Sequence, residues 1–174
     1  MSVPNVEKRV NVEIETIEKI PALKVIKPKV FPDDRGFFSE TYNITEWAEK
    51  LDYKEVFMQD NHSYSKYGVL RGLHTQPGMG KLVSVATGKI FDVAVDRINT
   101  PFWIPSGFLH GFQCLSPEGA HVTYKCTAVY DPKTEFGINP FDKEIDVQWP
   151  ITDQDKIIVS ERDTQHNDLS SLPR

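Results

Sequence analysis

Residues 81–96 read KLVSVATGKIFDVAVD. Two runs rich in Val, Ile, Ala and Phe lie on either side of the turn Thr87-Gly88-Lys89, a pattern typical of two strands joined by a short turn. Comparable runs, bounded by Pro, Gly, Asn and Asp, recur at residues 23–26, 37–42, 56–65 and 121–130. Many short strands at close spacing predict an all-β sandwich or barrel.

One convincing helix is expected among these strands, over residues 44–51. Trp47 lies on its apolar face, and Asn43 or Thr45 can cap its first turn. A helical turn at residues 160–163 has weaker support. No repeat, low-complexity segment or linker divides the sequence, so we expect a single domain over residues 1–174.

The two ends of the chain differ from its middle. Residues 1–20 mix charges with the alternating Val10, Val12 and Ile14, which predicts an edge strand or an arm that reaches a partner. Residues 164–174 are polar, and we expect a tail that is loose at its end.

Composition narrows the possible functions. The chain has 174 residues, with 20 Lys and Arg against 25 Asp and Glu, a net charge of −5. This balance argues against nucleic acid, whose binders need surplus cations. No apolar run reaches the roughly 18–20 residues that span a bilayer, and no secretory signal is visible, so we expect a cytoplasmic protein without a membrane partner. Cys114 and Cys126 are expected to be buried thiols.

Side-chain alternation predicts which residues face the inside of the barrel. In the run 121–130, Tyr124 and Tyr130 share one face. In the run 56–65, Gln59 and Asn61 share a face with Phe57. Amides on an inward face indicate a wet cavity that holds a ligand rather than a sealed core.

Residues 69–76 read VLRGLHTQ and hold a second group of polar residues. Arg71 lies between apolar residues, where its charge is costly to bury unless an anion pairs with it. The plainer interpretation is that Arg71 is a solvated arginine at a strand edge and that His74 is a structural histidine. Arg71 and His74 are three positions apart, so a regular strand sends them to opposite faces. We expect Gly72 to supply a bulge that turns one of them.

Residues 103–112 read WIPSGFLHGF, and a Pro-x-Gly turn that delivers His110 into a strand is similar to barrels of the cupin type. Many cupins bind a metal through His-x-His, a later Glu and a last His. Here His74 has no partner two residues away, so the ligand set is incomplete and we expect no metal. The sequence also lacks Gly-x-Ser-x-Gly and Gly-x-Gly-x-x-Gly.

The remaining polar residues suit proton abstraction next to a carbonyl group. His74 can act as the base, since imidazole is partly neutral near pH 7. Lys81 can stabilise the enolate that develops, and Tyr124 can return a proton from the other face, which inverts the carbon. This chemistry needs no cofactor.

Seven blocks of the sequence together resemble the dTDP-4-dehydrorhamnose 3,5-epimerases. The similarity runs from about Lys27 to Asp163. The blocks are KVFxDxRGFFxE at 29–40, QDNHS at 59–63, VLRGLH at 69–74, GKLV at 80–83, FDVAVD at 91–96, IPxGFxHGF at 104–112 and YKxT at 124–127.

This resemblance implies a cofactor-free, cupin-like jelly roll with a few short helices. It also implies a homodimer whose N-terminal strands are shared across the interface, and a dTDP-4-keto-6-deoxy sugar as substrate. His74 is then the base, oriented by Asp163, with Tyr124 as the proton donor and Lys81 facing the enolate. The implied nucleotide- and sugar-binding residues are Arg35, Glu40, Gln59, Asp60, Asn61, Arg71, His110, Glu135 and Arg162, with Phe31 and Tyr130 around the thymine.

The implied reaction inverts C3 and C5 of dTDP-4-dehydro-6-deoxy-D-glucose, on the route to L-rhamnose. Three alternatives remain at this point: an epimerase that inverts only one centre, a non-catalytic nucleotide-sugar binder, and a metal-dependent cupin enzyme.

One departure from the family pattern follows Asp96. Family members carry about two further strands there, on the order of 15–20 residues. A lost hairpin or a stretch omitted from the sequence would account for this difference.

Overall fold

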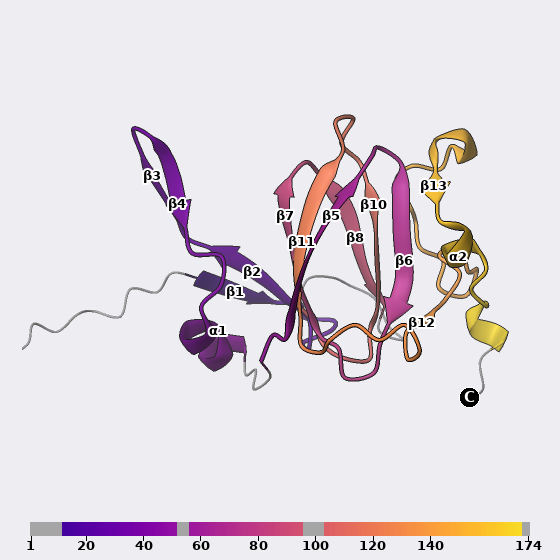
Figure 1. The fold of residues 1–174 in the computed structure, drawn as a ribbon, viewed down its shortest axis with the longest axis horizontal. Helices are drawn as coiled ribbons and strands as arrows, with labels where there is room; N and C mark the ends of the chain where they lie inside the picture. Colours follow the sequence, from indigo (N-terminus) through magenta and orange to yellow (C-terminus); the bar gives the residue numbers. More distant parts are fainter. Residues whose placement is uncertain (1–11, 52–55, 96–102, 172–174) are drawn as a thin grey trace, which may run out of the picture.

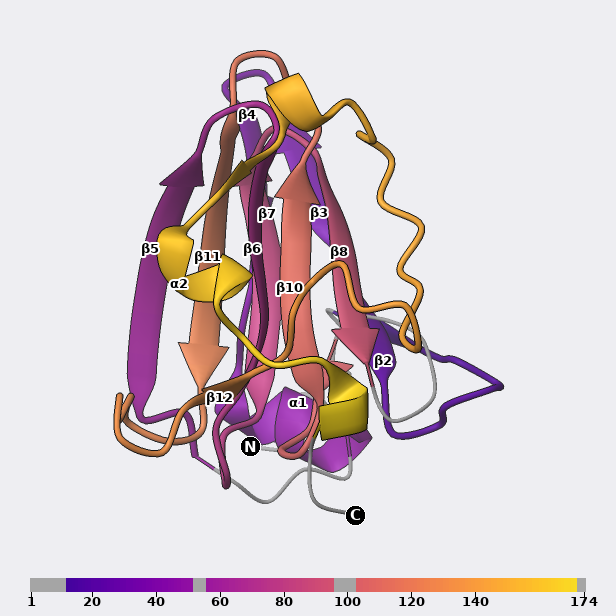
Figure 2. The same ribbon diagram turned by 90° about the vertical axis from the view of Figure 1, so that its right-hand side faces the viewer.

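A computed structural model describes residues 12–51, 56–95 and 103–171. The chain is mostly strands with a few short helices, which confirms the predicted all-β jelly roll. Two antiparallel sheets face each other, and the C-terminal segment covers the outside of one of them (Figures 1 and 2).

The first sheet has six strands in the order β1-β2-β9-β7-β11-β5. Strand β11 lies between β5 and β7, with Tyr124 opposite Asn61 on one side and Val83 on the other. The strands are β1 (Val12–Thr16), β2 (Lys24–Pro28), β5 (Gln59–Ser65), β7 (Lys81–Thr87), β9 (Trp103–Ile104) and β11 (Ala120–Cys126).

The second sheet follows the order β12-β6-β10-β8, and β13 pairs in parallel with the beginning of β6. Its central strand β6 carries most of the motif at residues 69–76, and its strand β10 carries the end of the motif at residues 103–112, including His110, whereas Trp103 and Ile104 form β9 of the first sheet. The strands are β6 (Val69–Thr75), β8 (Ile90–Val95), β10 (Leu109–Cys114), β12 (Phe136–Gly137) and β13 (Ile158–Val159).

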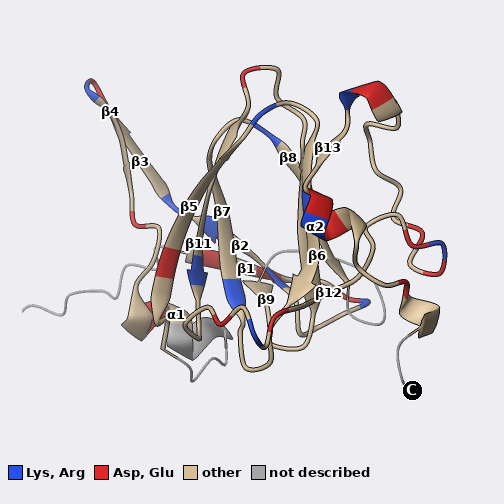
Figure 3. Ribbon diagram, turned by 45° about the vertical axis from the view of Figure 1, so that its right-hand side comes forward, with Lys and Arg blue, Asp and Glu red and all other residues tan. Residues whose placement is uncertain are grey.

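A separate hairpin, β3 (Val30–Asp33) and β4 (Gly36–Ser39), projects away from both sheets (Figure 1). Its tip carries the opposite charges of Asp33 and Arg35, which form an ion pair with each other (Figure 3).

Two short α-helices frame the sheets. Helix α1 (Ile44–Leu51) has the predicted bounds, and Asn43 is its cap because the Asn43 Oδ1 atom accepts the N–H groups of Thr45 and Glu46. Helix α2 (Glu161–Thr164) is capped by Ser160, which accepts the N–H of Asp163. The 3-10 turns η1 (Gln154–Lys156) and η2 (Leu169–Ser171) lie on either side of α2 in the chain.

Two of the three main apolar clusters lie on the outer faces of the sheets, and the third joins Val83 and Ile104 of the first sheet to Ala94 of the second. One joins Trp47 of α1 to Val12, Leu82 and Trp103. Another packs Leu70 and Leu73 of β6 against residues of the C-terminal segment, Ile138 and Trp149 among them. The clusters on the outer faces stabilise the two sheets, and the third cluster fills part of the space between them. Polar side chains line much of the rest of that space.

A bulge in β6 confirms the expectation for Gly72. His110 pairs with His74 and Phe112 pairs with Arg71, so two residues of β6 oppose only Gly111 of β10. The extra residue lets Leu70 and Leu73 point into the outer core while Arg71 and His74 both line the inner cavity.

Other expectations need correction or lie outside the described residues. Strand β11 ends at Cys126, so the run 121–130 is not one strand, and Tyr130 lies in the following loop. The shortened connection after Asp96 falls in residues 96–102, outside the described residues. Cys114 and Cys126 are free and buried, as predicted. Within the described ranges, no helix is long and apolar enough to cross a membrane.

We expect Gly72→Ala to destabilise the fold strongly. Gly72 has a φ of +123°, and an added Cβ would lie 2.5 Å from the Cα of Gly111. A strained φ alone costs about 1–3 kcal/mol, and the backbone contact adds to it. Urea denaturation measures the loss in free energy of unfolding.

The matched control is Gly36→Ala. Gly36 has a φ of +134° but has no heavy atom near an added Cβ. Equal losses for the two variants would contradict the role of the close approach at Gly72.

Candidate active site

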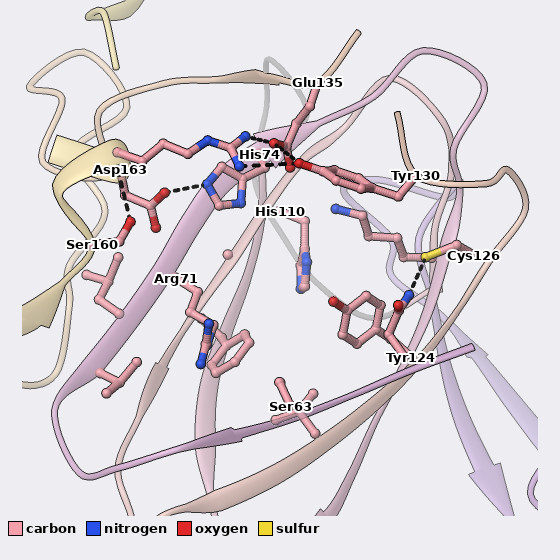
Figure 4. A pocket seen from close by; sticks show the side chains of 18 of the residues that line it. Ser63, Arg71, His74, His110, Tyr124, Cys126, Tyr130, Glu135, Ser160 and Asp163 are labelled. Carbon is pink, nitrogen blue, oxygen red and sulfur yellow. Dashed lines mark hydrogen bonds and ion pairs between the residues drawn. The ribbon is translucent and has the colours of Figure 1, made fainter. Parts of the chain in front are cut away.

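A cavity of about 610 Å³ lies between the two sheets, a size typical of small-molecule sites (Figure 4). All four predicted catalytic residues line it, together with seven of the predicted binding residues. These eleven residues are His74, Lys81, Tyr124 and Asp163, and Gln59, Asn61, Arg71, His110, Tyr130, Glu135 and Arg162.

His74 and Asp163 form a hydrogen-bonded pair on one wall of the cavity. The His74 Nε2–H donates to Asp163 Oδ1 at 2.7 Å, and the Gly72 N–H donates to the other oxygen. Burial alone would raise the pKa of Asp163, but these hydrogen bonds outweigh it and hold the pKa below its usual value. The carboxylate therefore stays ionised and leaves Nδ1 as the imidazole nitrogen that can accept a proton.

Tyr124 and Lys81 reach the cavity from the other sheet, on β11 and β7. Burial raises the pKa of Tyr124, so its phenol keeps its proton near neutral pH. Burial lowers the pKa of Lys81, while the nearby Asp92 carboxylate acts in the opposite direction. The cavity thus has a base on one wall, and a phenol and an amine on the facing wall.

Arg71 supplies a cation inside the cavity. Its Nε donates to Ser65 Oγ at 3.0 Å and its Nη2 to the Tyr64 carbonyl at 3.2 Å. Both partners are neutral, so the charge of the guanidinium is available to an anion.

The opening of the cavity has its own charged group. Arg162 of α2 forms an ion pair with Glu135, and the Tyr130 hydroxyl donates to the same Glu135 carboxylate at 3.0 Å. Arg162 also donates to the Tyr130 hydroxyl at 3.3 Å, which brings α2 and the loop after β11 together (Figure 4).

A second histidine–carboxylate pair supports the cavity wall. His110 Nε2 lies 2.8 Å from Asp92 Oδ1, and both side chains are almost fully buried. Reasoning from the sequence missed Asp92, although a charged residue in the apolar run IFDVAV was a usable signal.

Four predicted binding residues do not line this cavity. Phe31 and Arg35 lie on the projecting hairpin, and Glu40 follows it directly. Asp60 pairs with Lys125 at 2.8 Å on the other face of the first sheet. Within a single chain, these side chains are not part of the site.

Among the described residues, one group of side chains has the composition of a metal site: His74, Asp163 and His166. His62 and His121 lie on the outside of the first sheet, where two of their ring nitrogens are 2.9 Å apart.

An imidazole oriented by a carboxylate and a phenol on facing walls of one cavity are the groups that an enzyme needs to exchange protons at a carbon from two sides. The sequence model of the dTDP-4-dehydrorhamnose 3,5-epimerase family matches residues 18–101 and 97–171. The chain belongs to this family. The two matched segments meet where the sequence departs from the family pattern, after Asp96.

Individual relatives agree with this assignment. The dTDP-4-dehydrorhamnose 3,5-epimerase of Salmonella typhimurium is 45% identical over 154 residues, which cover 76% of this chain and 84% of the relative. A dTDP-4-dehydrorhamnose 3-epimerase of Streptomyces niveus is 32% identical over 164 residues, covering 78% and 79%.

Among solved structures, a crystal structure of the dTDP-6-deoxy-D-glucose-3,5-epimerase of Legionella pneumophila, in complex with dTDP-4-keto-L-rhamnose, is similar. It has a TM-score of 0.85 and 38% identity, and the match covers 93% of this chain and 95% of that one. The characterised relatives are isomerases, so the chain is of an isomerase family.

Proposed function

We propose that this protein inverts C3 and C5 of dTDP-4-dehydro-6-deoxy-D-glucose and yields dTDP-4-dehydro-L-rhamnose. The observation that carries the proposal is the arrangement of the His74–Asp163 pair and Tyr124 on facing walls of one cavity. Binding alone does not require an oriented base opposite a protonated phenol.

The proposed reaction proceeds through an enolate. The 4-keto group acidifies the protons on both neighbouring carbons, and His74 Nδ1 takes one of them. The electron pair moves onto the keto oxygen, where the Lys81 ammonium stabilises the negative charge. Tyr124 then donates its proton to the opposite face of the carbon, so the centre is inverted. His74 releases the abstracted proton to solvent and solvent reprotonates Tyr124, so both groups return to their starting states and no cofactor is consumed.

The remaining lining residues suit the nucleotide. Among the described residues, the hydrogen-bond partners of the Arg71 guanidinium are neutral, so its charge can meet a diphosphate. Tyr130 offers an aromatic face beside the Arg162–Glu135 pair, and Gln59 already accepts the Tyr130 N–H at 2.8 Å. These contacts support a base and sugar held at the opening of the cavity.

The projecting hairpin supports a homodimer. Phe37 and Phe38 are 73% and 67% exposed, which is costly unless another surface covers them. We propose that the hairpin of one subunit reaches the cavity of its partner, which would bring Phe31, Arg35 and Glu40 to the nucleotide.

An epimerase that inverts C3 alone is the second candidate. The relative from Streptomyces niveus is named a 3-epimerase, and base and acid alone do not fix how far the sugar ring turns between two inversions.

The base and the acid can be separated by proton exchange in D2O. We expect wild-type protein to incorporate deuterium at C3 and C5, insensitive to chelator. His74→Ala should lose exchange by about 10²–10⁴-fold while its affinity for dTDP stays within severalfold. Tyr124→Phe should retain proton removal and lose inversion at one centre. Proton NMR with a reductase that traps the L-sugar measures both.

Three results would change the assignment. Near-normal turnover of His74→Ala would remove His74 from the role of the base. Equal loss of exchange and inversion in Tyr124→Phe would contradict the role of the acid. Exchange at C3 alone in the wild type would establish the second candidate.

The pH dependence of kcat/KM tests the proposed role of the Lys81 ammonium in stabilising the enolate. Its pKa lies below the usual 10.5 because it is buried, so the ammonium is lost as pH rises through that lowered value. We expect kcat/KM to fall on the alkaline side, and Lys81→Arg to move the fall to higher pH because the guanidinium stays charged. Lys125→Arg, a cation on the outer face of the same sheet, is the matched control. An unchanged alkaline limb in Lys81→Arg would contradict this role.

The shared site can be tested by co-expressing two inactive variants. If the hairpin serves the partner, a mixture of Arg35→Ala and His74→Ala subunits regains about one quarter of the sites, since half of the dimers are mixed and each has one intact site. His74→Ala with Asp163→Ala is the control, because both residues belong to the same cavity and no site is restored. Absence of recovery in the first mixture would overturn the proposal.

A further inference from the structure

His166 contacts the catalytic pair, and the proposed reaction leaves it without a role. Its ring packs edge-on against His74, with centroids 5.5 Å apart. Its Nε2 atom is buried and, among the described residues, has no hydrogen-bond partner. His166 is not among the residues that line the cavity, although its ring packs against His74, which lines it.

Three atoms that can coordinate a metal ion lie close together here: His74 Nε2, Asp163 Oδ1 and His166 Nε2. Asp163 Oδ1 lies 2.7 Å from His74 Nε2 and 3.9 Å from His166 Nε2. All three donors lie within 4.8 Å of one another. A tetrahedral zinc ion holds imidazole and carboxylate ligands at about 2.0–2.2 Å, which sets them about 3.3 Å apart. The distances from Asp163 Oδ1 to the two Nε2 atoms, 2.7 Å and 3.9 Å, lie on either side of 3.3 Å. Small movements of the two imidazole rings would therefore give the separations that a tetrahedral zinc ion requires.

The backbone nearby makes room for His166. Gly137 of β12 pairs with His74, and an added Cβ at Gly137 would collide with the His166 ring. Arg162 is the nearest cation, and its charge is met by Glu135. Two imidazoles and one carboxylate are a ligand set that suits zinc and other late first-row divalent metals.

We propose that His74, Asp163 and His166 form a binding site for Zn²⁺, and that the ion inhibits the enzyme. Binding at Nε2 displaces the hydrogen that Nε2 donates to Asp163 and moves it to Nδ1. The neutral imidazole thereby loses the lone pair with which it takes a proton from the sugar. The inhibition rests on the proposed role of His74 as the base, whereas the binding does not.

The binding is tested first, without substrate, because Zn²⁺ also binds the diphosphate of a sugar nucleotide. Calorimetry with ZnCl2 on the full chain should detect one site per chain. Co²⁺ in place of Zn²⁺ should give visible absorption of a site with nitrogen and oxygen ligands. His166→Phe keeps the ring volume but removes the donor, and should weaken binding by at least about tenfold. His166→Ala gives the same test if the Phe variant does not fold.

The matched control is His121→Ala. It removes the exposed His62–His121 pair on the outside of the first sheet, the alternative place for the ion. We expect this variant to bind Zn²⁺ as the wild type does. Equal affinity in the wild type and His166→Phe, or loss of binding in His121→Ala alone, would overturn the site.

Inhibition is measured afterwards by deuterium exchange at C3 and C5. Zn²⁺ should inhibit the wild type and His121→Ala at the concentrations at which it binds, while His166→Phe should keep its basal rate and resist Zn²⁺. Activation by Zn²⁺, or equal inhibition of His166→Phe, would overturn the inhibitory role. If the chain lacks epimerase activity altogether, calorimetry still decides the site, so the two proposals fail separately.

Discussion

The buried carboxylate of Asp163 is the point on which the site depends. It accepts hydrogen bonds from the His74 imidazole and from the Gly72 N–H, and these residues lie 89 and 91 positions away in the sequence. The Asp163 carboxylate therefore links three parts of the molecule: the His74 imidazole, the bulge at Gly72 that turns this imidazole into the cavity, and helix α2, which carries Asp163. Strand β13 places this helix by pairing with β6 at Val69 and Leu70, just before the bulge. The His74–Asp163 pair, to which we assign the catalytic base, is thus built into the sheet, which fixes its geometry before any ligand binds.

Most of the inner wall could be predicted because strand alternation is a local property. Val122, Tyr124 and Cys126 share the face that the period of two assigns to them, and Gln59 and Asn61 follow the same rule on β5. The bulge was predictable for a similar reason, since a glycine between two polar residues three positions apart offers few other solutions. These predictions did not require knowledge of which strands are neighbours in a sheet or of the register between them.

The features that sequence reasoning missed depend on register and on contacts between distant segments. Tyr130 reaches the cavity through a loop, so its agreement with the alternation of β11 does not come from a continuous strand. Asp92 meets His110 only because β8 and β10 pair antiparallel. His166 meets the catalytic pair through the packing of the last segment on β12. The hairpin at residues 30–39 has strand-like composition, but nothing local in it says that it leaves the barrel.

The positions of charge and apolar packing together explain why an acidic protein can hold a nucleotide sugar. Two of the three main apolar clusters lie outside the sheets, and the third includes neither Arg71 nor Lys81, so the cavity can carry these two cations without disturbing the packing that keeps the sheets folded. Within the part of the chain that the structure describes, Arg71 donates hydrogen bonds to neutral oxygens, and burial works against the charge on Lys81. Both cations are therefore poorly compensated in the free protein. In the proposed reaction, the diphosphate and the developing enolate would each supply the missing negative charge, so the binding energy would go to the two groups that the reaction needs.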